Sequence, residues 1–146
     1  MPRYFTLVQA EELLPAVEKL IRRGVELKSE YQQAENSIQK ATQRIVMLGG
    51  SIANRGGMAD DRAHRDTAAG ALNAVLSELQ SMGVQVKDLD TGLLDFPTLF
   101  RGQEVLLCWR LGETGISFWH GLEEGFQGRK PLDDDFLANH QGDAVN

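Results

Sequence analysis

The sequence predicts an α+β protein in which a long antiparallel helical hairpin packs on a small antiparallel sheet of three or four strands. Three observations predict this fold. Apolar residues recur at heptad spacing over the first third of the chain, a second helical pattern follows a glycine-rich segment, and the apolar period changes to two from Val84 onward. We expect a single α+β domain over residues 1–132.

The first helix is expected over about residues 7–48. Thr6 and Gln9 have the spacing of a capping box, in which each side chain hydrogen-bonds the other residue's backbone N–H. Pro15 predicts either a kink or a short first helix with a restart, because proline has no N–H to donate.

A heptad seam runs through this helix. Its members are Leu13, Leu20, Leu27, Ala34, Ala41 and Leu48, with Val17, Gly24, Tyr31, Ile38 and Ile45 four residues after the first five. A seam of this kind packs along another helix. Leu14 and Ile21 widen the apolar stripe near its start, so we expect the first half on a core and the second half on a helix.

A loop and a second helix follow the seam. Residues 49–61 contain four glycines and no periodicity, which predicts a flexible loop, and no Gly-Lys-Ser/Thr follows as a Walker loop requires. A second apolar stripe predicts a helix over residues 61–82 that stops at Gly83. Asp60 and Asp61 are interpreted as charges at its positive end, and Asp60 with His64 as a weak metal-binding candidate.

The two predicted helices differ in length. At about 1.5 Å per residue, residues 15–48 span about 50 Å and residues 61–82 about 33 Å. Part of the first seam therefore lacks an intrachain partner. A homodimer through the helices would bury that part, and a different protein partner on the same helices is the other interpretation.

The strands are short and are joined by tight turns at residues 101–102 and 112–115. We expect them at residues 84–89, 93–99, 103–111 and 116–121. If Phe100 pairs with Gln103, then Asp95 lies opposite Cys108, and the next turn places Leu106 opposite His120.

Side-chain alternation then divides the sheet into two faces. The first face is apolar and is expected to form the core: Leu94, Phe96, Val105, Leu107, Trp109 and Trp119. The second face is mixed: Asp95, Glu104, Cys108, Arg110 and His120, with Leu93, Leu106, Ile116 and Phe118. On the mixed face we expect a diagonal ion pair between Asp95 and Arg110, and His120 diagonal to Cys108.

Three interpretations of the mixed face stay open. It forms a structural polar network, or a small-ligand or metal site that uses Asp95, Arg110, Glu113 and His120, or a set in which Cys108 is a nucleophile. Neither a CxxC nor an HxxxH spacing is present in the sequence, so no motif predicts a metal or another cofactor. We favour the structural network.

Composition and charge narrow the class of protein. The single Cys108 cannot form an internal disulfide, no apolar run reaches the roughly 18 residues of a membrane span, and the first residues do not resemble a signal peptide. We therefore expect a cytoplasmic protein without a membrane association. The net charge of −6 makes nucleic acid an unlikely partner. Residues 133–146 carry four aspartates and no lysine or arginine, and are expected to form a flexible acidic tail.

Two stretches resemble a known family. The string VKDLDTGLLDFPTLFRGQEVLLCWRLGETGISFWHGLEEGFQGRKPL, with the opening RYFTLVQAEELLPAVEKLI, is similar to the DUF2203 family of small bacterial and archaeal proteins over about residues 3–132. The family has no assigned activity, so the resemblance implies no reaction. It does imply that the following residues belong to the characteristic motif: Asp95, Cys108, Trp109, Arg110, Glu113, His120 and Arg129.

Two functional hypotheses follow. The first is a non-catalytic interaction or assembly protein that associates with itself or with a partner through its long helices. The second is an enzyme that binds a small ligand or a metal, in which Arg110 holds an anionic group and His120 acts as acid, base or ligand. We favour the first hypothesis, because no strong catalytic motif is present in the sequence.

Overall fold

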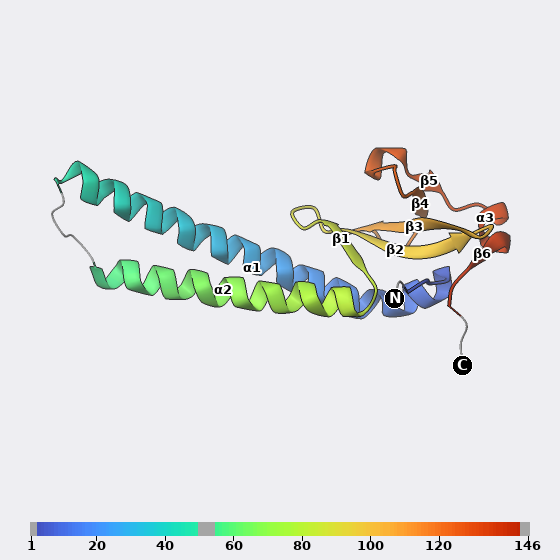
Figure 1. Cartoon of the computed structure of the whole chain (residues 1–146), viewed down its shortest axis with the longest axis horizontal. Helices are drawn as coiled ribbons and strands as arrows, with labels where there is room; N and C mark the ends of the chain where they lie inside the picture. The colour runs from blue at the N-terminus through green and yellow to red at the C-terminus, as the bar shows by residue number, and fades with distance from the viewer. Residues whose placement is uncertain (1–2, 50–54, 144–146) are drawn as a thin grey trace. The chain divides into compact units, whose positions relative to one another are not determined.

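The computed structural model describes residues 3–49 and 55–143, with side chains from residue 57 in the second stretch (Figure 1). Contacts divide the chain into two compact units. The first unit takes in the chain up to Arg22 and from Leu76 onward, and the second is Arg23–Val75. The α+β class is confirmed, since two long helices and an antiparallel sheet make up the chain.

The helix α1 is Leu7–Met47, a run of 41 residues. Its predicted capping box is confirmed: the Gln9 N–H donates to Thr6 Oγ1 at 3.1 Å, and the Thr6 N–H donates to Gln9 Oε1 at 3.0 Å. The helix continues through Pro15, so the predicted restart is wrong. Glu11 and Pro15 are both exposed, so the residue whose carbonyl loses its N–H donor at the proline is not in the core.

The helix α2 is Arg55–Ser81, which begins six residues before its predicted start. The predicted loop over residues 49–61 is therefore wrong for residues 55–61, and residues 50–54 lie outside the described residues. Glycine costs only about 1 kcal/mol in a helix, and packing of α2 along α1 outweighs it. Asp60 and Asp61 accordingly lie within the helix and not at its first residue.

In the second unit the two helices pack on each other along the predicted seam. Gly24, Leu27 and Ala34 are buried there. An ion pair of 2.9 Å between Arg65 on α2 and Glu35 on α1 flanks the seam. The two helices run in opposite directions (Figure 1), as a hairpin requires.

The sheet belongs to the first unit, and within the described residues it has six strands, not the three or four that were expected. They are β1 (Gln85–Asp88), β2 (Leu93–Phe100), β3 (Gln103–Arg110), β4 (Phe118–Gly121), β5 (Lys130–Pro131) and β6 (His140–Gln141). The order is β1-β2-β3-β4-β5, and β6 pairs with β2. All of the pairs are antiparallel.

The register of the central strands is the predicted one. Phe100 pairs with Gln103, Asp95 with Cys108, and Leu106 with His120. The turn between β2 and β3 has positive φ at Arg101 (52°) and Gly102 (80°), as a two-residue hairpin turn requires. This turn sets the register of β2 against β3.

The predicted apolar face forms the core of the first unit. Trp109 is fully buried, and its indole N–H donates to the Glu113 carbonyl at 3.1 Å. Trp119 is half-buried and lies against the rings of Phe100 and Phe136, with centroid distances of 5.3 and 5.0 Å. Burial of these aromatic rings is the main apolar gain of the face.

The expected loose acidic tail is wrong for residues 133–143. They form the short helix α3 (Asp134–Asn139) and then β6, and residues 144–146 lie outside the described residues. Asp133 caps α3 by accepting from the Phe136 N–H at 2.8 Å, and Phe136 is fully buried. One buried aromatic side chain and one cap outweigh the acidic composition of the segment.

The tail also caps α1. His140 Nδ1 lies 2.9 Å from the Leu137 carbonyl, and its Nε2 accepts from the Leu7 N–H at 3.0 Å. That N–H is one of the free donors at the start of a helix.

In the part of the chain that is described, no helix is both long and apolar enough to cross a membrane.

Candidate functional site

The mixed face of the sheet brings three chemically different side chains together. Asp95 on β2 lies directly opposite Cys108 on β3, and His120 on β4 lies diagonal to Cys108. A carboxylate oxygen, the Sγ atom and a ring nitrogen of these residues all lie within 4.8 Å of one another. Asp95 and Cys108 are 0% exposed and His120 is 4% exposed, so the cluster is shielded from solvent.

Both ring nitrogens of His120 face oxygen atoms. Nδ1 lies 2.8 Å from the Gly121 carbonyl oxygen, and Nε2 lies 3.0 Å from Asp95 Oδ1. A carbonyl oxygen only accepts, so we assign the proton to Nδ1. In the neutral ring Nε2 then carries a lone pair that points at a carboxylate, and a proton or a cation must lie between the two atoms.

Asp95 is a buried carboxyl group with an incomplete set of partners. Its Oδ2 atom has no hydrogen-bond partner in the described part of the chain. Burial raises the pKa of Asp95, and His120 is the main group that lowers it, followed by Lys87. A buried polar atom without a partner costs about 1–3 kcal/mol, so this atom calls for an explanation.

Cys108 is not an activated thiol in this arrangement. Burial and then the Asp95 carboxylate raise the pKa of Cys108 to about 11, although the Arg129 guanidinium lowers it. A nucleophilic cysteine needs a base, but Gly121 and Asp95 occupy both nitrogens of His120. The geometry does not support the nucleophile hypothesis.

Arg129 and Glu113 form the wall next to Cys108. Two guanidinium nitrogens of Arg129 lie 3.2 and 2.9 Å from the two carboxylate oxygens of Glu113. The guanidinium carbon also lies 4.0 Å from the ring centroid of Phe118 and 4.1 Å from that of Phe126. These contacts hold Arg129 in one orientation beside the thiol.

The predicted ion pair between Asp95 and Arg110 is wrong. Arg110 is exposed at the end of β3, opposite Leu93, and its guanidinium lies 5.5 Å from the Phe126 ring centroid. Asp95 is fully buried and pairs with His120 instead. Arg110 lies on the neighbouring strand, whereas His120 reaches Asp95 from β4, across β3.

A cavity of about 170 Å³ lies over the cluster. Asp95 and His120 line it from the sheet, Lys87 from β1, and Glu124 and Phe126 from the segment that follows β4. Glu124 is held by the Gly121 N–H and by Lys130, at 2.9 and 2.7 Å. The cavity gives a small molecule or water a place next to the carboxylate and the imidazole.

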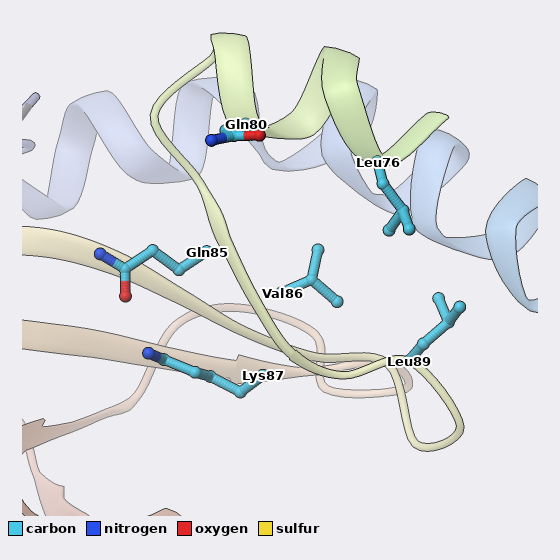
Figure 2. Close-up of a pocket in the computed structure, with 6 residues that line it drawn as sticks. All are labelled: Leu76, Gln80, Gln85, Val86, Lys87 and Leu89. Carbon is cyan, nitrogen blue, oxygen red and sulfur yellow. The ribbon is translucent and has the colours of Figure 1, made fainter. Parts of the chain in front are cut away.

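A larger cavity, of about 590 Å³, lies between the end of α2 and β1. Leu76 of α2 and Val86 and Leu89 of the β1 segment point toward one another, while Lys87 points away from the helix (Figure 2). The remaining lining groups are the amides of Gln80 and Gln85. This lining contains no acid, histidine or thiol.

The other predicted metal candidates are not assembled. Asp60 and His64 are both exposed on α2, and among the described residues the group with metal-ligating chemistry is Asp95, Cys108 and His120. Sequence reasoning missed Lys87 and Glu124. Nothing in the strand pattern signals them, because the segment after β4 must fold back before Glu124 reaches the cavity.

The fold and the cluster define a small α+β protein with a buried carboxylate, thiol and imidazole on one sheet face. The model of the family DUF2203, described as an uncharacterized conserved protein, matches residues 3–132. The chain therefore belongs to the DUF2203 family, as the resemblance indicated. No curated protein and no solved structure matches the chain.

Proposed function

We propose that this is a non-catalytic assembly protein that forms a homodimer through the α1–α2 hairpin of its second unit. The supporting observation is that the seam residues near the end of α1 are less buried than those before them. Ile38, Ala41 and Ile45 are only half-buried, and Leu48, the last member, is 53% exposed. Because α2 begins at Arg55, the length difference between the helices is smaller than the sequence predicted, so the proposal rests on this exposure.

Two helices by themselves cannot bury this stretch. The described part of the second unit contains α1 and α2 and no third element. Ala34 and Ala41 of the seam and Ala68 of α2 are small residues, which bury little apolar area. A two-helix hairpin of this kind gains stability when a second hairpin converts it into a four-helix bundle.

Exposed apolar residues cluster at the end of α1. Val46 is 73% exposed and Met47 is 85% exposed. Met47 and Leu48 also line a shallow cavity of about 340 Å³ together with Lys40, Gln43 and Arg44. A second copy of the hairpin has the same heptad spacing, and a two-fold axis lets each copy cover the other's exposed side chains.

Sedimentation velocity of the full-length protein across the micromolar range tests the proposal. We expect a dimer whose dissociation constant rises at least tenfold in a Met47→Glu, Leu48→Glu double variant. Both side chains are exposed, so the substitutions leave the monomer folded. Val8→Glu is the matched control, because Val8 is similarly exposed but lies in the first unit.

A monomer at every concentration, or equal dimerisation of the double variant and the wild type, would contradict the proposal. Dissociation of the Val8→Glu control to the same extent would also contradict it, because the interface would then not be the hairpin.

We place the protein in the cytoplasm, since a single cysteine leaves it without an internal disulfide.

A further inference from the structure

The cluster on the mixed face has the composition of a metal site. A carboxylate, a thiol and an imidazole come from three neighbouring strands, β2, β3 and β4. Their closest ligand atoms lie within 4.8 Å of one another. Atoms bound to one zinc ion at about 2.0–2.3 Å lie roughly 3–4 Å apart, so small side-chain rotations suffice to close the set.

The orientation of His120 separates this cluster from an ordinary buried network. The hydrogen bond between Nδ1 and the Gly121 carbonyl, 2.8 Å long, holds the ring and directs Nε2 toward Asp95 Oδ1. Metal-bound histidines are usually held in this way, with the non-ligating nitrogen donating to a carbonyl or a carboxylate. With the proton held on Nδ1, the lone pair of Nε2 can bind an ion placed between it and Asp95 Oδ1.

His140 provides an internal comparison. Its Nδ1 also lies against a backbone carbonyl, that of Leu137, but its Nε2 accepts from the Leu7 N–H at 3.0 Å. Both ring nitrogens of His140 therefore have hydrogen-bond partners within the protein. At His120 the position of the N–H donor is taken by a carboxylate, and Asp95 Oδ2 has no partner in the described part of the chain. A cation bound between them would provide a partner for both His120 Nε2 and the Asp95 carboxylate.

We propose that Asp95, Cys108 and His120 bind one divalent transition-metal ion, with zinc(II) the best match, through a carboxylate oxygen, Sγ and Nε2. A mixed nitrogen, sulfur and oxygen set is typical of zinc and excludes calcium and magnesium, which take oxygen ligands. The cavity above Asp95 and His120 leaves room for a fourth ligand, such as water. The site is independent of the proposed dimer.

Charge and protons balance when the ion binds. Two protons leave when the ion binds: the Cys108 S–H bond breaks, and the proton that lies between His120 Nε2 and Asp95 Oδ1 in the metal-free protein is displaced. Both protons pass to the buffer, and the sulfur forms a bond to the metal. The resulting thiolate and the Asp95 carboxylate together carry two negative charges, which a divalent ion neutralises inside the buried site. Arg129, held by Glu113, is placed to donate a hydrogen bond to the thiolate sulfur.

The test titrates Zn²⁺ and Co²⁺ into untagged full-length protein that has been treated with a chelator. Calorimetry in two buffers of different ionisation enthalpy is expected to show one ion per chain and proton release. Co²⁺ is expected to produce a thiolate-to-cobalt charge-transfer band, which reports sulfur ligation directly. The absence of binding, or cobalt binding without that band, would overturn the proposal.

Three variants test whether the ion binds at Asp95, Cys108 and His120. Cys108→Ser and Asp95→Asn remove a ligand with almost no change in volume, and we expect a loss of affinity greater than the roughly 10–100-fold that a second-shell partner costs. His64→Ala removes an exposed histidine on α2 and is expected to bind as the wild type does. Circular dichroism checks the fold of each variant.

Unchanged affinity in the Cys108→Ser and Asp95→Asn variants would mean an adventitious surface ion only, and would overturn the proposal. If either variant does not fold, the cobalt spectrum of the wild type still decides the question, because a thiolate band requires Cys108, the single cysteine of the chain. Monomeric protein that binds the ion would refute the dimer and leave the metal site standing.

Discussion

His120 and His140 differ in the group that faces Nε2, and this difference separates a structural histidine from a candidate ligand. Each Nδ1 lies within 2.9 Å of a backbone carbonyl oxygen. The Nε2 of His140 meets an N–H donor and that of His120 meets a carboxylate oxygen. His120 is buried and His140 is half-buried, but burial alone does not distinguish a ligand from a structural histidine. The chemistry of the group opposite Nε2 does, and the following predictions test that distinction.

The largest effect is expected from Phe136→Ala, which removes the anchor of the His140 region. The Phe136 ring stacks on Phe100 at 4.8 Å and on His140 at 5.3 Å. We expect a loss of about 3–5 kcal/mol in the free energy of unfolding, measured by urea denaturation. We also expect faster proteolysis of the chain after Leu132, since α3 loses its only buried side chain. A loss below about 1 kcal/mol would show that the tail is not docked.

Asp95→Asn is expected to have a smaller effect and the opposite sign. Asparagine can donate its N–H₂ to His120 Nε2, which a carboxylate cannot do. In a chelator at pH 7, we expect the variant to be as stable as the wild type, or more stable by roughly 1–3 kcal/mol, the cost of a buried polar atom without a partner. Thermal and urea denaturation measure this difference. A marked destabilisation would identify the Asp95–His120 pair as structural.

The pH dependence of stability provides the matching measurement. Burial raises the pKa of Asp95 above its unfolded value of about 3.9, so the unfolded chain loses this proton first as the pH rises. The wild type therefore loses stability between pH ~4 and the higher folded pKa. This loss is expected to disappear in Asp95→Asn. An identical pH profile for the two proteins would contradict the assignment.

His140→Ala is expected to cost about 1 kcal/mol, a value typical of a lost helix cap. The variant leaves the Leu7 N–H without its acceptor and removes one ring from the stack on Phe136. Urea denaturation measures the cost, and the affinity for Zn²⁺ is expected to stay unchanged. A change in zinc affinity would show that the two histidines are coupled, which the comparison does not predict.

The smallest effect is expected for alkylation of Cys108 in the chelated protein. The thiol is fully buried and its pKa is raised to about 11, so little thiolate forms below about pH 9. Iodoacetamide is expected to modify native protein slowly at pH 7 and faster as the pH rises. Urea-unfolded protein is the control, in which the reaction is rapid. Rapid modification of native protein at pH 7 would show an activated thiol.

The register of the sheet was predictable because it depends on local rules. Arg101 and Gly102 form a two-residue turn with positive φ, and side chains of a strand alternate strictly. Together these rules place Asp95 opposite Cys108 and His120 diagonal to it. The seam of α1 was predictable for a similar reason, since it is a repeat within one helix.

The errors arose where contacts distant in sequence decide the outcome. The start of α2 moved to Arg55 because packing along α1 outweighs glycine propensity. The tail docks because Phe136 finds the rings of Phe100 and Trp119. The partner of Asp95 is His120, two strands away on β4, and not Arg110 on the neighbouring strand, and no rule for cross-strand pairs predicts this contact.

The sequence by itself determined the class, the two helices, the central strands and the set of residues that shares the mixed face of the sheet. These follow from periodicity and turn chemistry, which act over a few residues. Only the tertiary structure decided that this face is buried, that His120 Nε2 points at Asp95, and that Asp95 Oδ2 has no partner in the described part of the chain. The reason is physical: burial and hydrogen-bond direction depend on the segment that folds back over the sheet after β4.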